Sequence, residues 1–270
     1  MSLETDGFLD NNFIKPDFPP DSSEAVHLSL ALDLSRFLMQ VIASVRPTPD
    51  SSWELIGPAL LCRLTQDFQA CILLANNGFR AQSRSMARAT FESATHCLGA
   101  AKNIELRNVS KESKALTYSE ALIRANEKYR RVVSQEITGI DETPASIKAK
   151  MSKLAGELLG ENTSIDLKTL AEALSIESLY TILYRPLSQD AHPTATSVSH
   201  HMSPDDEYSY TFGPDYSEFA DTLLAGIASA LVGLEGFLEK WGTNDELSHA
   251  SSLRARYKYL SRLFGPDEEH

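Results

Sequence analysis

Cysteine is scarce in this chain, and its few cysteines are not arranged as in a metal or redox site. Cys62, Cys71 and Cys97 are the only ones in 270 residues, and each lies beside apolar residues in a segment with helical spacing. None belongs to a C-x-x-C pair or to a cluster with histidine, which are the patterns of zinc and thiol redox sites. The sequence therefore predicts buried free thiols in a reducing compartment.

The short motifs of many nucleotide-binding and hydrolytic enzymes are also missing. The chain has no G-x-x-x-x-G-K, G-x-G-x-x-G or G-x-S-x-G, which argues against P-loop, dinucleotide-binding and hydrolase-elbow chemistry. His200 and His201 precede Asp205 and Asp206, but adjacent histidines do not share a helix face and the i, i+4 spacing of metal ligands is absent. We expect a polar loop there, with no metal and no other cofactor.

Positive charge is in short supply. The chain has 25 Lys and Arg against 37 Asp and Glu, a formal net charge of −12, which opposes loose binding to nucleic acid or to an anionic membrane. We find no signal-peptide pattern, and no apolar run approaches the roughly 20 residues that span a bilayer. We therefore expect a cytoplasmic protein without membrane contact, in which any RNA contact uses a local basic patch.

The best basic patch lies near the C-terminus, where aromatic residues are interleaved with cations. Its four basic residues are Arg254, Arg256, Lys258 and Arg262. Aromatic rings between cations are a common platform for single-stranded nucleic acid, so these four are candidate RNA contacts. The alternative is an ordinary solvated helix face whose long side chains cover apolar surface.

Helical periodicity is what the sequence has in abundance. Hydrophobic residues make up 42% and charged residues 23%, close to the average for a folded soluble chain. Almost every long segment repeats its apolar residues with the 3.6 period, and alternating strand patterns are nearly absent. The expected fold class is all-α, mainly an antiparallel helical bundle because connections such as NNG at 76–78 are short. A short hairpin is a candidate near residues 207–213.

Capping and helix-breaking residues indicate the boundaries. Residues 1–23 show no period, so we expect a flexible arm or a strap that packs through its phenylalanines. Residues 24–270 are expected to form a single helical domain. The expected helices are a first one capped by Ser22 or Ser23 and ended by Pro47, a second from Ser51 or Ser52 to the NNG sequence, and others over 79–102, 111–137, 144–159, 166–174, from 176 onward, 215–241 and 245–264.

The most unusual stretch is YRPLSQDAHP at residues 184–193, where two prolines interrupt a helical pattern. Pro186 lacks a backbone donor and disfavours helical backbone at Arg185, so we expect the helix to kink or restart there. In an unbroken helix, Arg185 and His192 would lie about 10 Å apart along the axis. A kink would turn the long Arg185 side chain toward His192.

A second polar group is expected on the helix over 79–102. Arg88 and Glu92 lie at the edge of its apolar stripe, among small residues that permit another helix to pack closely. If the helix of the unusual stretch is that partner, Tyr184, Ser188 and His192 complete a semi-buried polar cluster. Because buried ions are costly unless paired, such a cluster is either a satisfied structural network or a functional site. The plainer alternatives are an ordinary ion pair and a helix-end histidine.

On these residues the sequence resembles a known superfamily. Arg185, six residues and His192 fit the R-x4-6-H motif of the HEPN (higher eukaryotes and prokaryotes nucleotide-binding) helical domains. The pairing of RSMARATFES with LYRPLSQDAHP is similar to an uncharacterised bacterial family within or near that superfamily, over about residues 50–240. The resemblance implies a homodimeric ribonuclease of toxin or defence type, whose catalytic Arg185 and His192 share a cleft and cut RNA without a metal. It also implies an antitoxin or another partner protein.

This chemistry suits the two residues. Neutral His192 would take the proton from a ribose 2′-hydroxyl, and Arg185 would stabilise the charge that grows on the phosphorane, which leaves 2′,3′-cyclic phosphate ends. Active members usually carry a polar residue directly after the arginine, where this chain has Pro186. The alternative function is a non-catalytic module that senses a nucleotide or binds a partner protein. A third reading is a purely structural polar network.

Overall fold

The computed structural model describes residues 16–45, 52–106, 116–122, 165–191, 198–199, 201–202 and 213–264. Contacts divide the chain into two units, residues 1–101 with 177–270 and residues 102–176, and each is described by itself. In the described residues helices predominate and strands are few, which confirms the expected all-α fold class.

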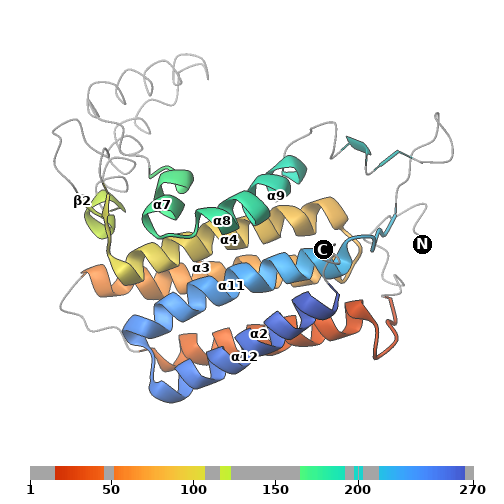
Figure 1. Cartoon of the computed structure of the whole chain (residues 1–270), viewed down its shortest axis with the longest axis horizontal. Helices are drawn as coiled ribbons and strands as arrows, with labels where there is room; N and C mark the ends of the chain where they lie inside the picture. The colour runs from red at the N-terminus through yellow and green to blue at the C-terminus, as the bar shows by residue number, and fades with distance from the viewer. Residues whose placement is uncertain are drawn as a thin grey trace, which may run out of the picture. The chain divides into compact units, whose positions relative to one another are not determined.

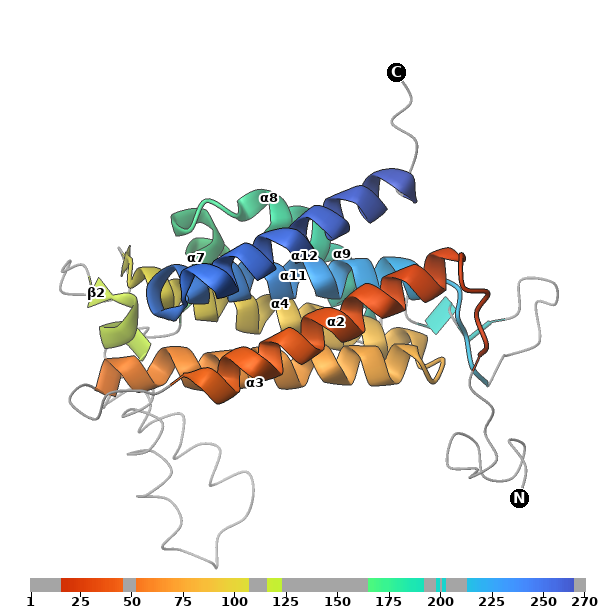
Figure 2. The same cartoon turned by 90° about the horizontal axis from the view of Figure 1, so that it is seen from below.

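Long helices form the larger unit and lie side by side in both views of Figures 1 and 2. These helices are α2 (Ser23–Ser44), α3 (Ser52–Ala75), α4 (Arg80–Lys102), α11 (Phe219–Trp241) and α12 (Asn244–Leu263). Short connections join α3 to α4 and α11 to α12, as expected for neighbouring antiparallel helices.

The core of this unit surrounds α11, which packs against α2, α3 and α12. Leu231, Leu234 and Phe237 on α11 are fully buried. Small residues let this helix approach its neighbours closely. A Cβ on Gly233 would lie 2.6 Å from the side chain of Leu64 and 2.9 Å from the backbone of Ala94. The run GIASALVG therefore sets how closely α11 packs on α3 and α4.

Several helix ends lie where capping chemistry predicted them. Ser22 caps α2 by accepting a hydrogen bond from the backbone N–H of Ala25, as expected for a serine N-cap. Gly78 ends the turn after α3 with a φ of +73°, a conformation that glycine adopts without a Cβ penalty. A Cβ there would also lie 2.5 Å from Pro214. Phe18 packs against the core with its ring 4.8 Å from that of Phe219, as a strap would.

The smaller unit corrects one expectation. Residues 116–117 were expected within a helix over 111–137, but they form strand β2 (Leu116–Thr117), which pairs antiparallel with β1 (Glu105–Leu106). The helix begins only after Thr117, because Thr117 and Glu120 make reciprocal hydrogen bonds to each other's backbone N–H, a capping box. The sequence T-x-x-E carried this signal. Helix α7 (Leu167–Ala173) starts after Asp166, whose side chain caps it as predicted.

Other expectations fall on residues that are not described. These are the arm over residues 1–15, most of 111–137, the helix over 144–159 and the hairpin near 207–213 apart from its last residue. At residues 215–241 the start of the helix was misjudged, since α11 begins at Phe219 and Glu218 before it has a left-handed backbone with a φ of +66°.

Two helices in the described residues are long and apolar enough to pass a membrane-span criterion, α2 and α11. The expectation that no run approaches this length was therefore too strict. In the most apolar window of α11, 72% is buried inside the protein, as in the core helix of a soluble bundle. Length and composition alone are weak grounds for a membrane span.

The three cysteines are free thiols, and Cys71 and Cys97 are buried. Burial raises the pKa of each of these two thiols to about 12. Because the thiolate is the reactive form of cysteine, both are inert core residues at neutral pH.

Candidate functional site

The unusual stretch lies on a short segment of changing helix type that packs against α4. It consists of α8 (Glu177–Leu179), the π-helical turn η2 (Tyr180–Tyr184) and α9 (Arg185–Asp190). The N–H of Arg185 donates to the carbonyl of Tyr180, five residues back. Pro186 has no N–H to give to the turn before it, and a π turn in that place is a known way to accommodate such a break.

The expected irregularity at Pro186 exists, but not at the residue we expected. Arg185 keeps helical backbone angles, with φ −64° and ψ −47°, so the expectation that Pro186 would move it out of the helical region was wrong. The preceding turn absorbs the conflict by widening instead. The exposed face of the segment consequently carries Arg185, Pro186 and Gln189.

Four of the predicted cluster residues lie together, and we call them the Arg88 cluster: Arg88, Glu92, Tyr184 and Ser188. Arg88 Nη2 donates to Tyr184 Oη at 2.8 Å and lies 2.7 Å from Glu92 Oε1. Arg88 Nε donates to Ser188 Oγ at 3.1 Å. Tyr184 Oη donates in turn to Glu92 Oε1 at 3.0 Å. The small residues of α4 thus admit the partner helix that the sequence indicated.

Aromatic contacts reinforce this cluster. The Arg88 guanidinium carbon lies 4.9 Å from the centre of the Tyr184 ring, within the range of a cation–π interaction. The Tyr184 ring also stacks on Tyr180 and packs against Phe91. With its ions paired and its hydroxyls bonded, the Arg88 cluster has the properties of an anchor that fixes the segment on α4.

A second polar network holds the other end of the segment; we call it the Arg84 network. Arg84 Nε lies 2.6 Å from Asp190 Oδ2, and Arg84 Nη1 lies 2.8 Å from Glu218 Oε2. Arg80, one turn earlier on α4, lies 2.7 Å from Glu218 Oε1 and 3.1 Å from Asp215 Oδ2. The Asp190 side chain is 1% exposed, whereas that of Glu218 is 34% exposed.

Two groups of the Arg84 network, Arg80 and Asp215, have shifted pKa values. Burial acts to lower the pKa of Arg80, but hydrogen bonds to Glu218 and Asp215 outweigh it and raise the pKa above its ordinary value. Burial acts to raise the pKa of Asp215, but hydrogen bonds from Ser217 and Arg80 hold it below its ordinary value. Both groups are therefore charged at neutral pH.

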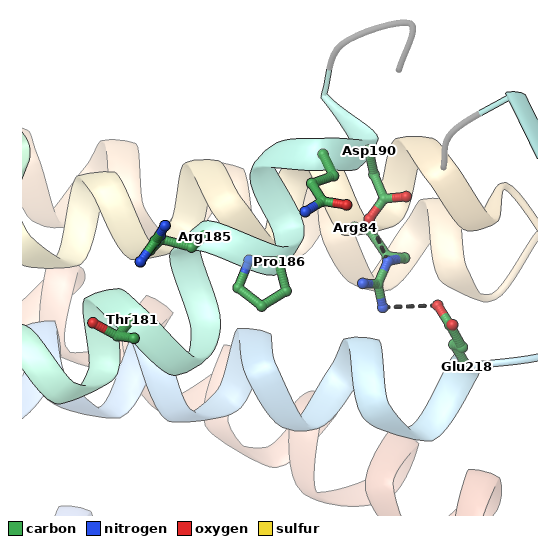
Figure 3. Close-up of a pocket in the computed structure, with 7 residues that line it drawn as sticks. Arg84, Thr181, Arg185, Pro186, Asp190 and Glu218 are labelled. Carbon is green, nitrogen blue, oxygen red and sulfur yellow. Dashed lines mark hydrogen bonds and ion pairs between the residues drawn. The ribbon is translucent and has the colours of Figure 1, made fainter. Parts of the chain in front are cut away.

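Between these elements lies a pocket of about 410 Å³. Its lining residues are Arg84, Thr181, Arg185, Pro186, Gln189, Asp190 and Glu218. In the view of Figure 3, Arg84 and Glu218 lie on one side of Pro186 and Arg185 lies on the other. Arg185 is exposed, and among the described residues no carboxylate forms an ion pair with it.

The other half of the predicted catalytic pair, His192, lies outside the described residues, as do His200, Asp205 and Asp206. The last described residue before His192 is Ala191, which directly follows the buried Asp190. The Arg84 network thus anchors the chain two residues before His192.

The candidate RNA contacts on α12 separate into two groups. Arg254 is engaged by Glu235 through two bonds of 2.9 and 2.6 Å, and Arg256 lies 2.8 Å from Asp33. Lys258 and Arg262 are exposed, and in the described part of the chain neither has an ion-pair partner. Of the four predicted RNA contacts, Lys258 and Arg262 therefore remain as cations without a carboxylate partner in the described residues, so the basic surface is smaller than the sequence suggested.

Sequence reasoning missed Asp190 and Glu218, which complete the pocket. Their signal was weak, because neither has a recognisable motif. A stronger signal is the spacing of Arg80, Arg84 and Arg88, which puts three arginines along one side of α4. Because buried cations need partners, the segment that packs against this side is expected to supply carboxylates.

His96 was missed too, although it continues the same spacing of four from Arg88 and Glu92. Burial lowers the pKa of His96, and the nearby Glu92 carboxylate partly offsets this. Ser93 on α4 donates a hydrogen bond to the buried carboxylate of Asp67, which also accepts one from Arg63. The polar side of α4 therefore extends beyond the Arg88 cluster.

A family model described as "Family of unknown function (DUF5677)" matches residues 55–209. This range is more than half of the chain, so the chain belongs to that family. No curated protein and no solved structure matches the chain. The match confirms the expectation of an uncharacterised family, while the HEPN resemblance stays a prediction.

Proposed function

We propose that this member of the DUF5677 family is a HEPN-like, metal-independent endoribonuclease that uses Arg185 and His192. One observation carries the proposal. Arg80, Arg84 and Arg88 each pair with carboxylates, whereas Arg185, which lines the pocket together with Arg84, has no carboxylate partner in the described residues. A guanidinium in that state is available to a phosphate group, which it binds through two parallel hydrogen bonds.

The contacts around Arg185 support a fixed backbone position for this residue. The segment is fixed to α4 on one side by the Arg88 cluster and on the other by the bond from Arg84 to Asp190. Catalytic groups need such support, because misplacement of about 1 Å can cost much of the rate. Here Arg185 stabilises charge on the phosphorane, and His192 acts as the general base toward the 2′-hydroxyl.

The remaining features of the proposal come from the HEPN resemblance. The protein is a homodimer of bacterial toxin or defence type, with two motif segments facing one cleft and with an antitoxin or similar protein as a regulatory partner. A cytoplasmic location is proposed separately, from its free cysteines. The acidic net charge of −12 fits an enzyme that touches RNA through a small basic site rather than a broad surface.

A second function is favoured by the pocket itself. Its volume of about 410 Å³ falls in the range of small-molecule sites, which runs from about 300 to 1,000 Å³. Its lining holds two arginines and two carboxylates. A non-catalytic module that senses a nucleotide through this pocket, with Pro186 in place of the usual polar residue, is the alternative.

The test is cleavage of a broad panel of end-labelled RNAs by the purified protein in EDTA, with mapping of the product ends. We expect 2′,3′-cyclic phosphate ends, and a loss of rate on the order of 100-fold in Arg185→Ala and in His192→Ala. Arg36→Ala, which removes an exposed cation on α2, is the matched control and should cleave normally. Intact RNA throughout would overturn the proposal in favour of the sensing module. Equal rates in all variants would overturn the role of Arg185 and His192.

A further inference from the structure

We propose that the pocket beside Pro186 binds a phosphate ester through two guanidinium groups, Arg185 and Arg84, and that Glu218 is the carboxylate which the phosphate displaces from Arg84. The inference rests on the proposed function in its use of Arg185. It adds Arg84 as a second residue that contacts the phosphate, and Glu218 as a carboxylate that competes with the phosphate for Arg84. It requires binding and does not require cleavage.

Arg84 has one edge fixed and one edge facing the pocket. Its Nε is held by the buried Asp190 at 2.6 Å, and its Nη1 meets the carboxylate of Glu218 at 2.8 Å. A guanidinium offers five donors in a planar fork, so the bond to Asp190 fixes the orientation of the others. Because both Arg84 and Glu218 line the pocket (Figure 3), the Nη1 edge is the part within reach of a ligand.

Glu218 is the exchangeable partner of Arg84. Its side chain is 34% exposed, whereas that of Asp190 is 1% exposed. Its backbone is left-handed at φ +66°, and its side chain makes no capping bond to α11. A residue other than glycine in this conformation is strained, and strain of this kind persists where surrounding contacts hold it and often marks a functional site. Glu218 Oε2 occupies the position beside Arg84 Nη1 in which an oxygen of a bound phosphate would lie.

Release of Glu218 from Arg84 would leave no carboxylate stranded. Glu218 Oε1 also lies 2.7 Å from Arg80, which in turn lies 3.1 Å from Asp215. The carboxylate can therefore stay on Arg80 while a phosphate takes its place on Arg84. The lining charges are two arginines and two carboxylates while Glu218 faces the pocket. Withdrawal of Glu218 would leave an excess of one positive charge, which favours the binding of a phosphate ester anion.

The size of the pocket and its polar lining indicate a ligand of nucleotide dimensions. A volume of about 410 Å³ is large enough for one nucleotide. Thr181 adds a hydroxyl and Gln189 an amide to the lining. The phosphate ester belongs either to a free nucleotide or to one nucleotide of an RNA strand, and both sources present the same group to Arg84 and Arg185.

The experiment measures binding by calorimetry with the full chain and two probes, AMP and a short RNA whose 2′-hydroxyls are methylated so that it cannot be cleaved. Glu218→Gln and Glu218→Gly should each tighten binding about tenfold, since both remove the competing carboxylate. Glu218→Gly also relieves the left-handed strain, so it keeps the test valid if the glutamine variant folds poorly. Arg84→Lys retains the charge beside Asp190 but loses the fork, and should weaken binding about tenfold.

Glu239→Gln is the matched control, because it changes the net charge equally at an exposed carboxylate of α11 that does not line the pocket. It should bind both probes as the unaltered protein does. Binding of AMP alone identifies a free nucleotide as the source, and binding of the RNA alone identifies a strand. Absence of binding by both probes, or affinities unmoved by the Glu218 and Arg84 variants, overturns the inference. If binding follows the variants while no RNA is cleaved, the nuclease proposal fails and this inference stands.

Discussion

Arg84 Nε and Asp190 Oδ2 lie 2.6 Å apart, and the Asp190 side chain is 1% exposed. The two residues come from positions 106 apart in the chain. Their bond fastens the last turn of α9 to α4, two residues before His192. It therefore fixes the position of the last turn of α9, the described part of the chain that precedes His192.

Removing the cation from this pair should destabilise the protein strongly. Arg84→Leu leaves the buried Asp190 carboxylate without its arginine, and we expect a loss of about 3 kcal/mol in the free energy of unfolding. The double variant with Asp190→Leu should recover most of that loss, because it removes the buried carboxylate together with its arginine. Urea unfolding measures both values. Equal losses in the single and the double variant would contradict this account.

The hydroxyl of Tyr184 should matter more than that of its stacked neighbour. Tyr184 Oη accepts a bond from Arg88 and donates one to Glu92, so Tyr184→Phe should cost about 1–2 kcal/mol. Tyr180→Phe is the control, because the Tyr180 ring stacks on Tyr184 but makes no hydrogen bond with the Arg88 cluster. We expect that variant to lose less than about 0.5 kcal/mol. Indistinguishable unfolding midpoints for the two variants would argue against the anchor.

The close approach of α11 to α3 and α4 can be tested at two glycines. Gly233→Ala would bring a Cβ to 2.9 Å from the backbone of Ala94, and such overpacking should cost about 1–3 kcal/mol. Gly226→Ala brings its Cβ no closer than 3.4 Å to Phe68, so it should be neutral or stabilise by up to about 1 kcal/mol through helix propensity. Thermal unfolding of the two variants gives the comparison, and a tolerated Gly233→Ala would refute the contact.

The free energy of unfolding should decrease as the pH falls through a range set by the pKa of His96. Burial lowers the pKa of His96 in the folded protein, so between about pH 6.5 and that lowered value the unfolded chain binds a proton that the folded chain does not. Stability is thus retained above about pH 6.5 and lost as the pH falls through this window. His96→Gln should flatten the dependence of the unfolding free energy between about pH 7 and 5. An unchanged slope would show that another group causes it.

Local chemistry explains why the helix boundaries were predictable. Ser22, Gly78 and Asp166 act within a few residues of their own positions, and the sequence contains everything that such a cap needs. The Arg88 cluster was also foreseeable, because a spacing of four on α4 meets a spacing of four at Tyr184 and Ser188. By contrast, the helix start at Thr117 was missed although its capping box is equally local.

Long-range contacts explain what was missed. Glu218 reaches Arg84 from far along the chain, and no periodicity reveals that the turn before α11 would bring it there. The π turn was also beyond sequence reasoning. Pro186 predicts a disturbed hydrogen-bond ladder, but whether the chain bends at Arg185 or widens before it depends on the anchors at Tyr184 and Asp190, which both belong to the tertiary structure.

The π turn at Tyr180–Tyr184 also bears on which changes of length the segment can tolerate. A turn with bonds five residues apart holds one residue more than an α turn, so it is equivalent to a one-residue insertion. In a regular helix an insertion rotates every later side chain by about 100°. Here a single turn takes up the extra residue, and Ile182 within it is 67% exposed. Deletion of one residue within this turn would therefore leave Ser188 and Asp190 facing the same residues of α4.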